Sequence, residues 1–229
     1  LGVIPARSGS KSIINKNIKK INNLPLLYYT IKPALKSNVF DRVIVSTDSQ
    51  KYLNIAKKFG ISTPFLRPKN LSTSSSLAID TITHAVLKCE RVFKEKYDLV
   101  CMLQPTSPLR TIKDFKLIIS RMKKNYNKYD SIISVVDVDN YHPIKMKYIM
   151  NNQLFDYKKW NIENPPRQSL PKIYIVNGAF YLFKRDILIK KKSFKGNKSL
   201  PYIMPKSRSI NIDNILDFEL AKMIIKNQK

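Results

Sequence analysis

The chain opens with the stretch Leu1-Gly-Val-Ile-Pro-Ala-Arg-Ser-Gly-Ser-Lys-Ser-Ile-Ile-Asn-Lys-Asn17, around which the rest of the sequence is organised. Its first four residues are apolar and predict a buried strand that ends at Pro5. A loop of mostly small residues follows, with the cations Arg7, Lys11 and Lys16. Small residues let a backbone come close to a ligand, free N–H groups can hold phosphate oxygens, and cations neutralise their charge. The stretch therefore suits a nucleoside triphosphate.

The common phosphate-binding motifs do not describe this loop. No Gly-Lys-Ser or Gly-Lys-Thr follows at the Walker A spacing, and the dinucleotide pattern Gly-x-Gly-x-x-Gly is missing. On spacing alone, a basic surface loop is as good an interpretation as a phosphate site. Residues elsewhere in the chain have to decide between the two.

Composition places the chain among folded globular proteins. Its 229 residues are 43% hydrophobic and 10% aromatic, which predicts a sizeable core in one domain or two small ones. No apolar run approaches the roughly 18 residues of a membrane span, and the opening residues do not resemble a signal peptide. The cysteines Cys89 and Cys101 lack partner His residues nearby, so we expect buried thiols in a reducing cytosol. We therefore expect a cytoplasmic protein with no membrane partner.

The formal net charge of +26 is the most unusual bulk property. Such a charge suits nucleic acid, an anionic membrane surface or an acidic small substrate. However, the lysines are spread along the chain among Asn and Ile residues, with one dense run at Lys190-Lys-Lys192, and no DNA or RNA recognition motif accompanies them. We therefore expect no nucleic-acid partner, although a phosphate-rich substrate would benefit from the positive field.

Alternating strand and helix patterns follow the opening stretch. The sequence predicts strands at 42–47, 98–103, 131–136 and 173–183, and helices at 25–36, 50–59, 77–94 and 112–124. A short strand near Tyr202 and a C-terminal helix to about Lys226 complete the chain. This alternation without internal repeats predicts an α/β fold with a doubly wound, mostly parallel, Rossmann-like sheet.

Local signals refine these elements. Pro25 suits the first turn of its helix, whereas Pro33 predicts a kink or a restart there. Gly60 is placed as a C-cap, and the run Ser72-Thr-Ser-Ser-Ser76 offers N-caps to the helix that follows. Asp48 comes directly after a predicted strand, and in an open parallel sheet the carboxyl ends of strands face the ligand crevice.

The regular alternation breaks from about Asp137 to Pro171. This part of the chain predicts short strands and loops, and such an excursion is often an interaction arm or a lid. Residues 1–229 therefore form one predicted domain with an inserted arm at about 137–171. The strand that follows the arm is interrupted by Gly178.

Six motifs in this order resemble the acylneuraminate cytidylyltransferases (CMP-sialic acid synthetases). They are Ile4-Pro-Ala-Arg-Ser-Gly-Ser-Lys11, Lys16-Asn17, Val45-Ser-Thr-Asp48, Leu103-Gln-Pro-Thr-Ser-Pro-Leu-Arg110, Arg167-Gln168 and Asn177-Gly-Ala-Phe-Tyr181. The resemblance covers the whole chain. It is specific for the sugar-nucleotide cytidylyltransferases and less specific for the nonulosonic acid that is activated.

The resemblance implies a Mg²⁺-dependent nucleotidyltransferase that joins CTP to the anomeric hydroxyl of a nonulosonic acid and releases pyrophosphate. It also implies a homodimer whose dimerisation arm crosses to the other subunit. N-acetylneuraminate is the default substrate, with legionaminate- or pseudaminate-type sugars as rivals. A 3-deoxy-octulosonate cytidylyltransferase is the alternative enzyme, although the Arg167-Gln168 and Asn177-to-Tyr181 motifs fit the sialate branch better.

The resemblance also assigns roles to residues. Residues implied in catalysis are Arg7, Lys11, Lys16 and Arg167. Residues implied in nucleotide binding are Ala6, Arg7, Ser10, Lys11, Asn17, Arg67 and Ser76. Residues implied in sugar binding are Gln104, Thr106, Ser107, Lys145, Arg167 and Tyr181. For each cation alone, a solvated surface charge is the alternative interpretation. For Tyr181 the alternative is an aromatic on the sheet face, and we interpret His142 as structural.

The implied metal site departs from the family pattern. The family supplies Asp-Ile-Asp near the last strand, whereas this chain has Asn211-Ile-Asp213. Spacing of i and i+2 puts both side chains on one face of an extended segment, and Mg²⁺ takes oxygen ligands. Asn211 can still ligate through its carbonyl or a bridging water, but one negative charge is lost. Asp217 and Asp48 are candidate compensators. The departure also leaves open a catalytically weakened sugar-nucleotide binding protein.

Overall fold

A six-stranded sheet forms the centre of the structure, a computed structural model that describes residues 1–10, 12–159 and 165–227. Its strand order is β10-β6-β9-β5-β1-β4, from β1 (Gly2–Pro5), β4 (Val43–Ser46), β5 (Leu99–Met102), β6 (Ser131–Asp137), β9 (Tyr174–Lys184) and β10 (Ser199–Ile203). β1 runs parallel to β4 and β5, and β10 runs parallel to β6. β9 runs antiparallel to both of its neighbours, β5 and β6. The predicted mostly parallel α/β sheet is confirmed.

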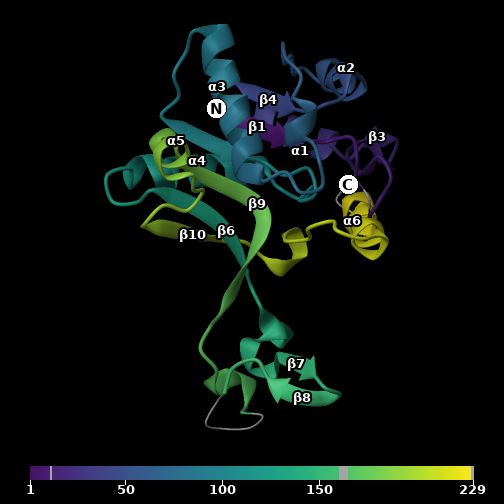
Figure 1. Cartoon of the computed structure of the whole chain (residues 1–229), viewed down its shortest axis with the longest axis vertical. Helices are drawn as coiled ribbons and strands as arrows, with labels where there is room; N and C mark the ends of the chain where they lie inside the picture. The colour runs from purple at the N-terminus through teal and green to yellow at the C-terminus, as the bar shows by residue number, and fades with distance from the viewer. Residues whose placement is uncertain (11, 160–164, 228–229) are drawn as a thin grey trace.

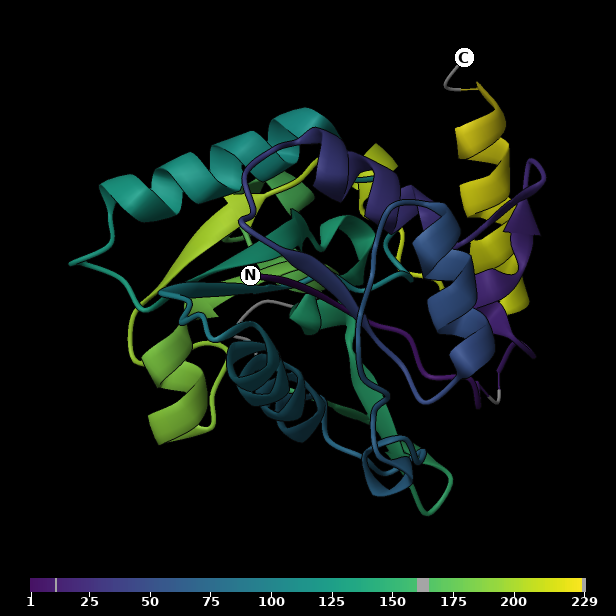
Figure 2. The ribbon, with the colours of Figure 1, turned by 90° about the horizontal axis from the view of Figure 1, so that it is seen from above.

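Helices cover both faces of the sheet (Figure 2). The six α-helices of the described chain are α1 (Tyr28–Lys36), α2 (Gln50–Lys58), α3 (Ala78–Phe93), α4 (Ile112–Lys124), α5 (Arg185–Lys191) and α6 (Ile215–Asn227). Side chains alternate between the faces of a strand. Ile4 therefore joins the core under α1 and α4, whereas Val3 joins the core under α3 and α5. The sheet is doubly wound, as predicted.

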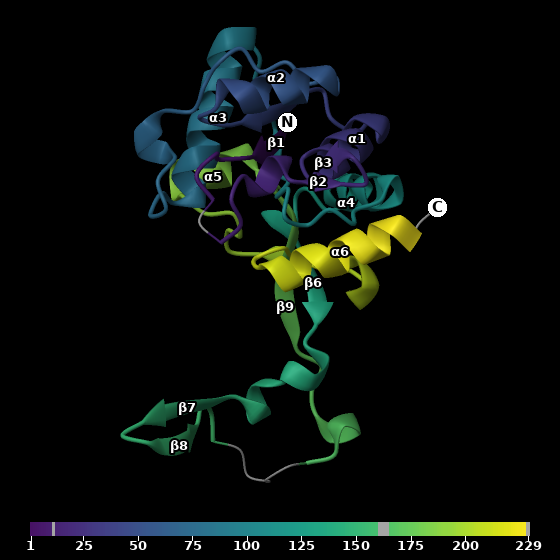
Figure 3. The same ribbon diagram turned by 90° about the vertical axis from the view of Figure 1, so that its right-hand side faces the viewer.

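A third, smaller core joins the two ends of the chain. Ile13, Ile21 and Leu26 come from the N-terminal segment, and they pack with Ile212 and Phe218 from the C-terminal segment. The N-terminal part includes a small hairpin of β2 (Lys20–Ile21) and β3 (Leu24–Pro25), and α6 lies beside it (Figure 3). This core fixes the opening loop against the segment that leads into α6.

The arm leaves the body along β6 and β9, which stay paired as far as Asp137 and Tyr174. Figure 1 shows it projecting from the body, with a hairpin of β7 (Lys147–Met150) and β8 (Gln153–Asp156) at its far part. Asn151 and Asn152 form the hairpin turn with φ of 51° and 61°, and paired positive φ values are typical of a type I′ turn.

Three short 3₁₀ segments lie in the arm. η3 (Asp139–Tyr141) and η4 (Pro143–Lys145) come between β6 and β7, and η5 (Arg167–Ser169) comes between β8 and β9.

Two local predictions are wrong. Pro25 lies in β3, where it pairs with Lys20, and its helix begins only at Tyr28 because the preceding residues form the hairpin. The serine run does not cap α3, since Leu77 occupies the N-cap and makes no side-chain cap. The Ser76 hydroxyl instead donates to the Asn70 carbonyl oxygen at 3.1 Å. By contrast, the prediction for Gly60 is confirmed, because it follows α2 with a φ of +93°.

The structure also tests the expectations of buried thiols and of no membrane-spanning helix. Cys89 and Cys101 are free and buried, and burial raises the pKa of the Cys101 thiol to about 12. Both are therefore inert core thiols, as predicted. None of the helices in the described part of the chain combines the length and apolar character that a membrane span requires.

Candidate active site

A cleft of about 510 Å³ opens at the carboxyl ends of β1 and β5. Open α/β sheets bind ligands at this edge. The cleft brings together most of the predicted site residues, namely Arg7, Ser10, Lys16, Asn17, Arg67, Ser76, Gln104, Thr106 and Asp213. The polar loop after β1, the loop after β5 and the segment before α6 thus meet at one place.

Two side chains shape the loop that follows β1. Asn17 is buried, and its Nδ2 donates to the Arg7 carbonyl oxygen at 3.0 Å. Asp48 accepts from the Ser8 amide at 2.9 Å and from the Ser8 hydroxyl at 2.8 Å. Asn17 was expected at the nucleoside; the structure gives its amide a bond that holds the loop, although the side chain also lines the cleft.

The Asp48 carboxylate is committed to this loop. Burial alone would raise its pKa, but the hydrogen bonds from Ser8 outweigh burial and leave the pKa below its usual value of 3.8. Because each carboxylate oxygen accepts from Ser8 and Asp48 does not line the cleft, it does not fit the suggested role of a compensating metal ligand.

Two further cations of the cleft are partly enclosed. The Lys16 ammonium donates to the Ile212 carbonyl oxygen at 2.8 Å, and burial lowers the pKa of this lysine. Arg67 is only 6% exposed and donates to the Ser46 carbonyl oxygen. Burial lowers the pKa of Arg67 to about 10, so it stays charged at neutral pH. Its Nε has no hydrogen-bond partner within the described chain. The cleft is therefore positive.

The opposite wall is built around Gly178, which has a φ of +74°. A Cβ at this position would lie 2.5 Å from Oε1 of Gln104 and 3.2 Å from Oγ of Ser107. Only glycine allows the β9 backbone to come so close to Gln104. Ser107 is 1% exposed and donates to the Asn177 carbonyl oxygen at 3.2 Å. Ser107 is therefore enclosed behind the wall, where it holds the β9 backbone, instead of making the expected contact with the sugar.

Arg110 supports this wall, although the sequence did not indicate it as a site residue. Its guanidinium donates to the Ala179 carbonyl oxygen at 2.7 Å, to the Gln104 carbonyl oxygen at 2.9 Å and to the Thr30 hydroxyl. Burial lowers the pKa of Arg110 to about 9. The one available signal was its place at the end of the motif that contains Gln104. Arg110 is a positioning residue for the loop after β5.

The segment before α6 carries the implied metal site. Its central residue, Ile212, is held from both sides, because its N–H donates to the Thr106 carbonyl oxygen at 2.8 Å and its carbonyl accepts from Lys16. Asp213 then reaches the cleft. Asp217 accepts from the Asp213 amide at 2.9 Å and from the Asn214 amide at 3.0 Å, so it caps α6.

The donors present fit a metal only in part. Within the described residues, no group of three or more His, Cys, Asp or Glu side chains could hold a metal ion. Asp213 is the one carboxylate that lines the described cleft, and Mg²⁺ is often held by one or two carboxylates together with substrate phosphates. The site therefore fits Mg²⁺ when phosphate oxygens complete the coordination.

A buried carboxylate anchors the segment that follows β10. Asp114, in the first turn of α4, accepts from the Tyr202 hydroxyl at 2.7 Å and from Arg208, and it forms a capping box with Thr111. Burial alone would raise the pKa of Asp114, but these hydrogen bonds outweigh it and hold the pKa below its usual value of 3.8. The ionised carboxylate fixes the path of the chain towards the cleft.

We expect Asp114→Asn to lower the free energy of unfolding more at pH 7 than in acid. Because the pKa of Asp114 is depressed in the folded state, its stabilisation is present above 3.8 and is lost as pH falls through the folded pKa. Urea unfolding over a pH series measures the difference. Asp41→Asn, at an exposed position, is the control and should show no such dependence. A pH-independent difference for Asp114→Asn would contradict the assignment.

Other predicted site residues lie outside the cleft. Ala6 is buried beneath it, and Lys145 and Arg167 are in the arm. Tyr181 packs in the core under α3, with its ring centroid 5.8 Å from that of Phe194, so the structure favours the sheet-face alternative. Lys11 lies outside the described residues.

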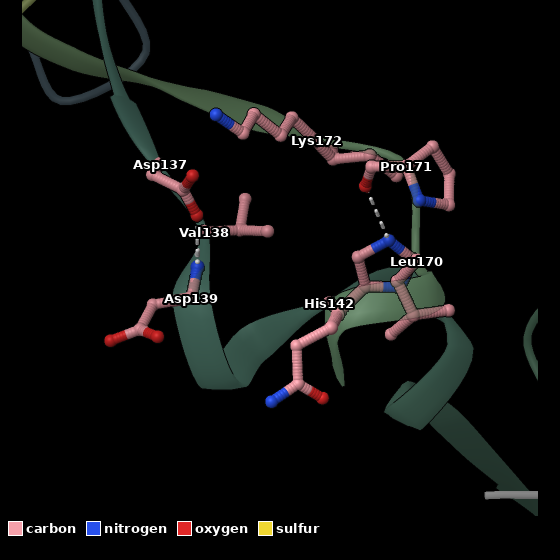
Figure 4. A pocket seen from close by; sticks show the side chains of 9 residues that line it. Asp137, Val138, Asp139, His142, Leu170, Pro171 and Lys172 are labelled. Atoms are coloured by element: carbon pink, nitrogen blue, oxygen red, sulfur yellow. Dashed lines mark hydrogen bonds between the residues drawn. The ribbon is translucent and has the colours of Figure 1, made fainter. Parts of the chain in front are cut away.

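A second cavity, of about 360 Å³, lies at the root of the arm (Figure 4). His142 is buried there, and its Nε2 lies 3.2 Å from the Pro171 carbonyl oxygen while its Nδ1 accepts from the Ile144 amide. Because Nδ1 accepts, Nε2 carries the proton and donates. These bonds support the structural interpretation of His142.

An open, mostly parallel sheet with a cationic cleft at its carboxyl edge defines an α/β nucleotide-binding protein. The comparison with family models makes this specific. Residues 1–229 match the model described as Cytidylyltransferase, and the chain belongs to this family. The family expected from the motifs is confirmed.

Individual proteins agree with this assignment. The chain is 37% identical over 227 residues to the N-acylneuraminate cytidylyltransferase of Escherichia coli O18:K1:H7 (strain RS218 / NMEC). The match covers 96% of this chain and 51% of the relative, so the chain spans about half the length of that protein. It is 32% identical over 225 residues to the CMP-N,N'-diacetyllegionaminic acid synthase of Campylobacter jejuni subsp. jejuni serotype O:2 (strain ATCC 700819 / NCTC 11168), covering 98% and 94% of the two chains.

A solved structure shares the fold. The structure of a CMP:2-keto-3-deoxy-manno-octonic acid synthetase complexed with CTP matches 100% of this chain and 99% of its own chain, with a TM-score of 0.73 and 16% identity. At this identity the likeness shows the fold alone.

Proposed function

We propose that this protein transfers the cytidylyl group of CTP to the anomeric hydroxyl of a nonulosonic acid and releases pyrophosphate. The observation that carries the proposal is the single cleft in which Arg7, Lys16 and Arg67 face Gln104 and Asp213. A positive side suits a triphosphate, and the amide side suits a hydroxylated sugar. The names of the relatives support cytidylyl transfer to sugars of this class.

In this reaction the protein mainly positions the two substrates and neutralises the charge of the phosphates. The hydroxyl oxygen attacks the α-phosphorus in line and gives up its proton to solvent, the bond to the bridging oxygen breaks, and the electron pair leaves with pyrophosphate. Arg7 and Lys16 neutralise the charge that develops on the leaving group, and the charge of Arg67 in the same cleft adds to this effect. Gln104 orients the sugar. We propose Mg²⁺ as the cofactor, held by Asp213 and phosphate oxygens, where it supplies further charge neutralisation.

Relatives named for N-acylneuraminate, N,N'-diacetyllegionaminic acid and pseudaminic acid match with 37%, 32% and 32% identity, which supports N-acetylneuraminate or a legionaminate- or pseudaminate-type acid as the sugar. A 3-deoxy-octulosonate substrate has weaker support, since the synthetase for that sugar shares only the fold. Pyrophosphate release from CTP, Mg²⁺ and a panel of these acids tests the proposal. Release with at least one nonulosonic acid is expected. Binding of CTP without release for any acid would instead favour a catalytically weakened binding protein.

We also propose that the protein is a cytosolic homodimer joined through the arm. An apolar groove of about 670 Å³ lies between the arm root and α6, with Tyr141, Met146 and Leu220 in its wall. The hairpin exposes Ile149 by 74% and Leu154 by 67%, and these residues face each other across β7 and β8. Exposed apolar patches of this kind mark interaction sites. The buried thiols suit the reducing cytosol.

We expect the double variant Ile149→Asp/Leu154→Asp to be monomeric, because two carboxylates would have to be buried in the interface. Sedimentation velocity measures the oligomeric state. Gln153→Asp, at another exposed hairpin position, adds a charge as a control and should leave the dimer intact. If the double variant remained dimeric, the hairpin would not be the dimer interface.

A mixing experiment tests whether the arm serves the partner's cleft. We expect Arg7→Ala and the double variant Lys145→Ala/Arg167→Ala each to have strongly reduced activity, since the first lacks one cleft cation and the second lacks the arm cations. Mixed dimers would contain one cleft with all of these groups, so activity should return on mixing. No recovery on mixing, with dimer exchange verified, would contradict a crossing arm.

A further inference from the structure

Asn211 lines the groove at the arm root rather than the cleft itself, and its side chain lies between Asp213 and the wall around Gly178. It is half-buried, and its Nδ2 donates to Oδ2 of Asp213 at 3.1 Å. Its Oδ1 faces the Ser107 hydroxyl at 3.5 Å and would lie 3.3 Å from a Cβ at Gly178. An amide can donate to Asp213 with one end and accept with the other, whereas an ionised carboxylate can only accept. The side chain therefore links the Asp213 carboxylate to the wall that holds Gln104.

The charges around Asp213 bear on how a cation could reach it. Arg7, Lys16 and Arg67 line the same cleft, whereas Asp213 is its one carboxylate among the described residues. The nearby Asp217 is bonded to backbone amides. Three positive groups and one negative group make the empty cleft repel a divalent cation. A bound triphosphate would reverse the sign of the field and supply further oxygen ligands.

We propose that Asn211 is a positioning residue that holds the Asp213 carboxylate in place without a metal, so that the divalent cation enters the cleft with the nucleotide instead of residing in the free protein. The inference rests on the proposed function, because it assigns the nucleotide a part in the metal site. The Asn211 amide takes the place of a cation as the partner of Asp213.

Asn211→Asp separates this arrangement from a resident metal site. The substitution keeps the size of the side chain but replaces the donor by an oxygen about as close to Asp213 as the present Nδ2, and two carboxylates so close repel each other unless a cation lies between them. The variant should therefore bind a divalent cation without nucleotide. Asn214→Asp is the matched control, since it adds the same charge one residue after Asp213 and keeps an oxygen that can cap α6.

Titration with Mn²⁺, followed by the electron paramagnetic resonance of the free ion, tests the inference. Without nucleotide, Asn211→Asp should bind Mn²⁺ at least about 10-fold more tightly than the wild type or Asn214→Asp, as expected for a second carboxylate ligand. With a non-hydrolysable CTP analogue, the wild type should bind the metal–analogue complex more tightly than metal alone. Equal Mn²⁺ affinity of the wild type and Asn211→Asp without nucleotide would overturn the proposal.

Thermal unfolding gives a second readout that does not require CTP. In EDTA, Asn211→Asp should unfold at a lower temperature than the wild type, and Mg²⁺ should restore much of the loss, whereas Asn214→Asp should respond little to Mg²⁺. A loss that Mg²⁺ does not restore would contradict the pairing of the two carboxylates. Failure of the analogue to bind the wild type would count against the proposed function, while the nucleotide-free titrations would still decide the role of Asn211.

Discussion

Replacing Arg7 by Ala is expected to lower kcat/KM by about 10²- to 10³-fold, the usual cost of removing one preorganised donor to developing charge. Arg7 lies in the loop after β1 and lines the cleft, and the loop is held by its backbone carbonyl through Asn17 rather than by its guanidinium. Steady-state kinetics with CTP and the preferred sugar measure the effect. The melting temperature should stay close to that of the wild type, because the guanidinium makes no hydrogen bond or ion pair with the described residues.

The control for this prediction is Arg91→Ala, which removes an exposed cation from α3. It should change neither activity nor stability, since surface cations contribute little. If the melting temperature of Arg7→Ala fell in parallel with its activity, the loss would be structural and Arg7 would not be a phosphate-binding residue.

Replacing Arg110 by Met is expected to destabilise the fold by about 3 kcal/mol or more, the range for leaving buried polar groups without partners. The substitution removes the donors to the carbonyl oxygens of Ala179 and Gln104 and to the Thr30 hydroxyl. Urea unfolding measures the loss of free energy. Arg91→Met, at the exposed position on α3, is the matched control.

The more conservative Arg110→Lys tests the positioning role of Arg110 separately from its role in stability. Lysine keeps the charge but cannot reproduce the planar fork of donors. Because Arg110 supports the Gln104 side of the cleft, KM for the sugar should rise more than KM for CTP. Equal changes in both constants would indicate a general effect on the fold.

The sequence predicted the architecture well because strand and helix periods are local properties. The helix at 112–124 was placed at its observed bounds. β4 and β5 lie within their predicted ranges, whereas β6 and β9 each extend one residue beyond theirs. Helix α5 was missed, since its seven residues end in a lysine run that was interpreted only as charge. Pro25 was misplaced because the β2–β3 hairpin depends on packing against α6, which lies far away in sequence.

The sequence predicted several residues of the candidate site but not the contacts that position them. Resemblance placed Gln104 and Asp213 in a cleft, and the fold brings both there. It could not show which face of β9 each side chain occupies, because much of this strand is buried on both faces, and Tyr181 packs into the core under α3. Nor could spacing reveal that Ser107 is enclosed or that Asn211 is bonded to Asp213, since both facts depend on contacts between distant segments.

Phosphorus nuclear magnetic resonance of the complete reaction tests the central claim most directly. With CTP, Mg²⁺ and the preferred nonulosonic acid, the three CTP resonances should be replaced by one phosphodiester resonance of the CMP-sugar and one of pyrophosphate, in equal amounts. The Arg7→Ala variant should form both more slowly and in the same ratio. Unchanged CTP with every acid, or release of CMP without a phosphodiester product, would contradict cytidylyl transfer at this cleft.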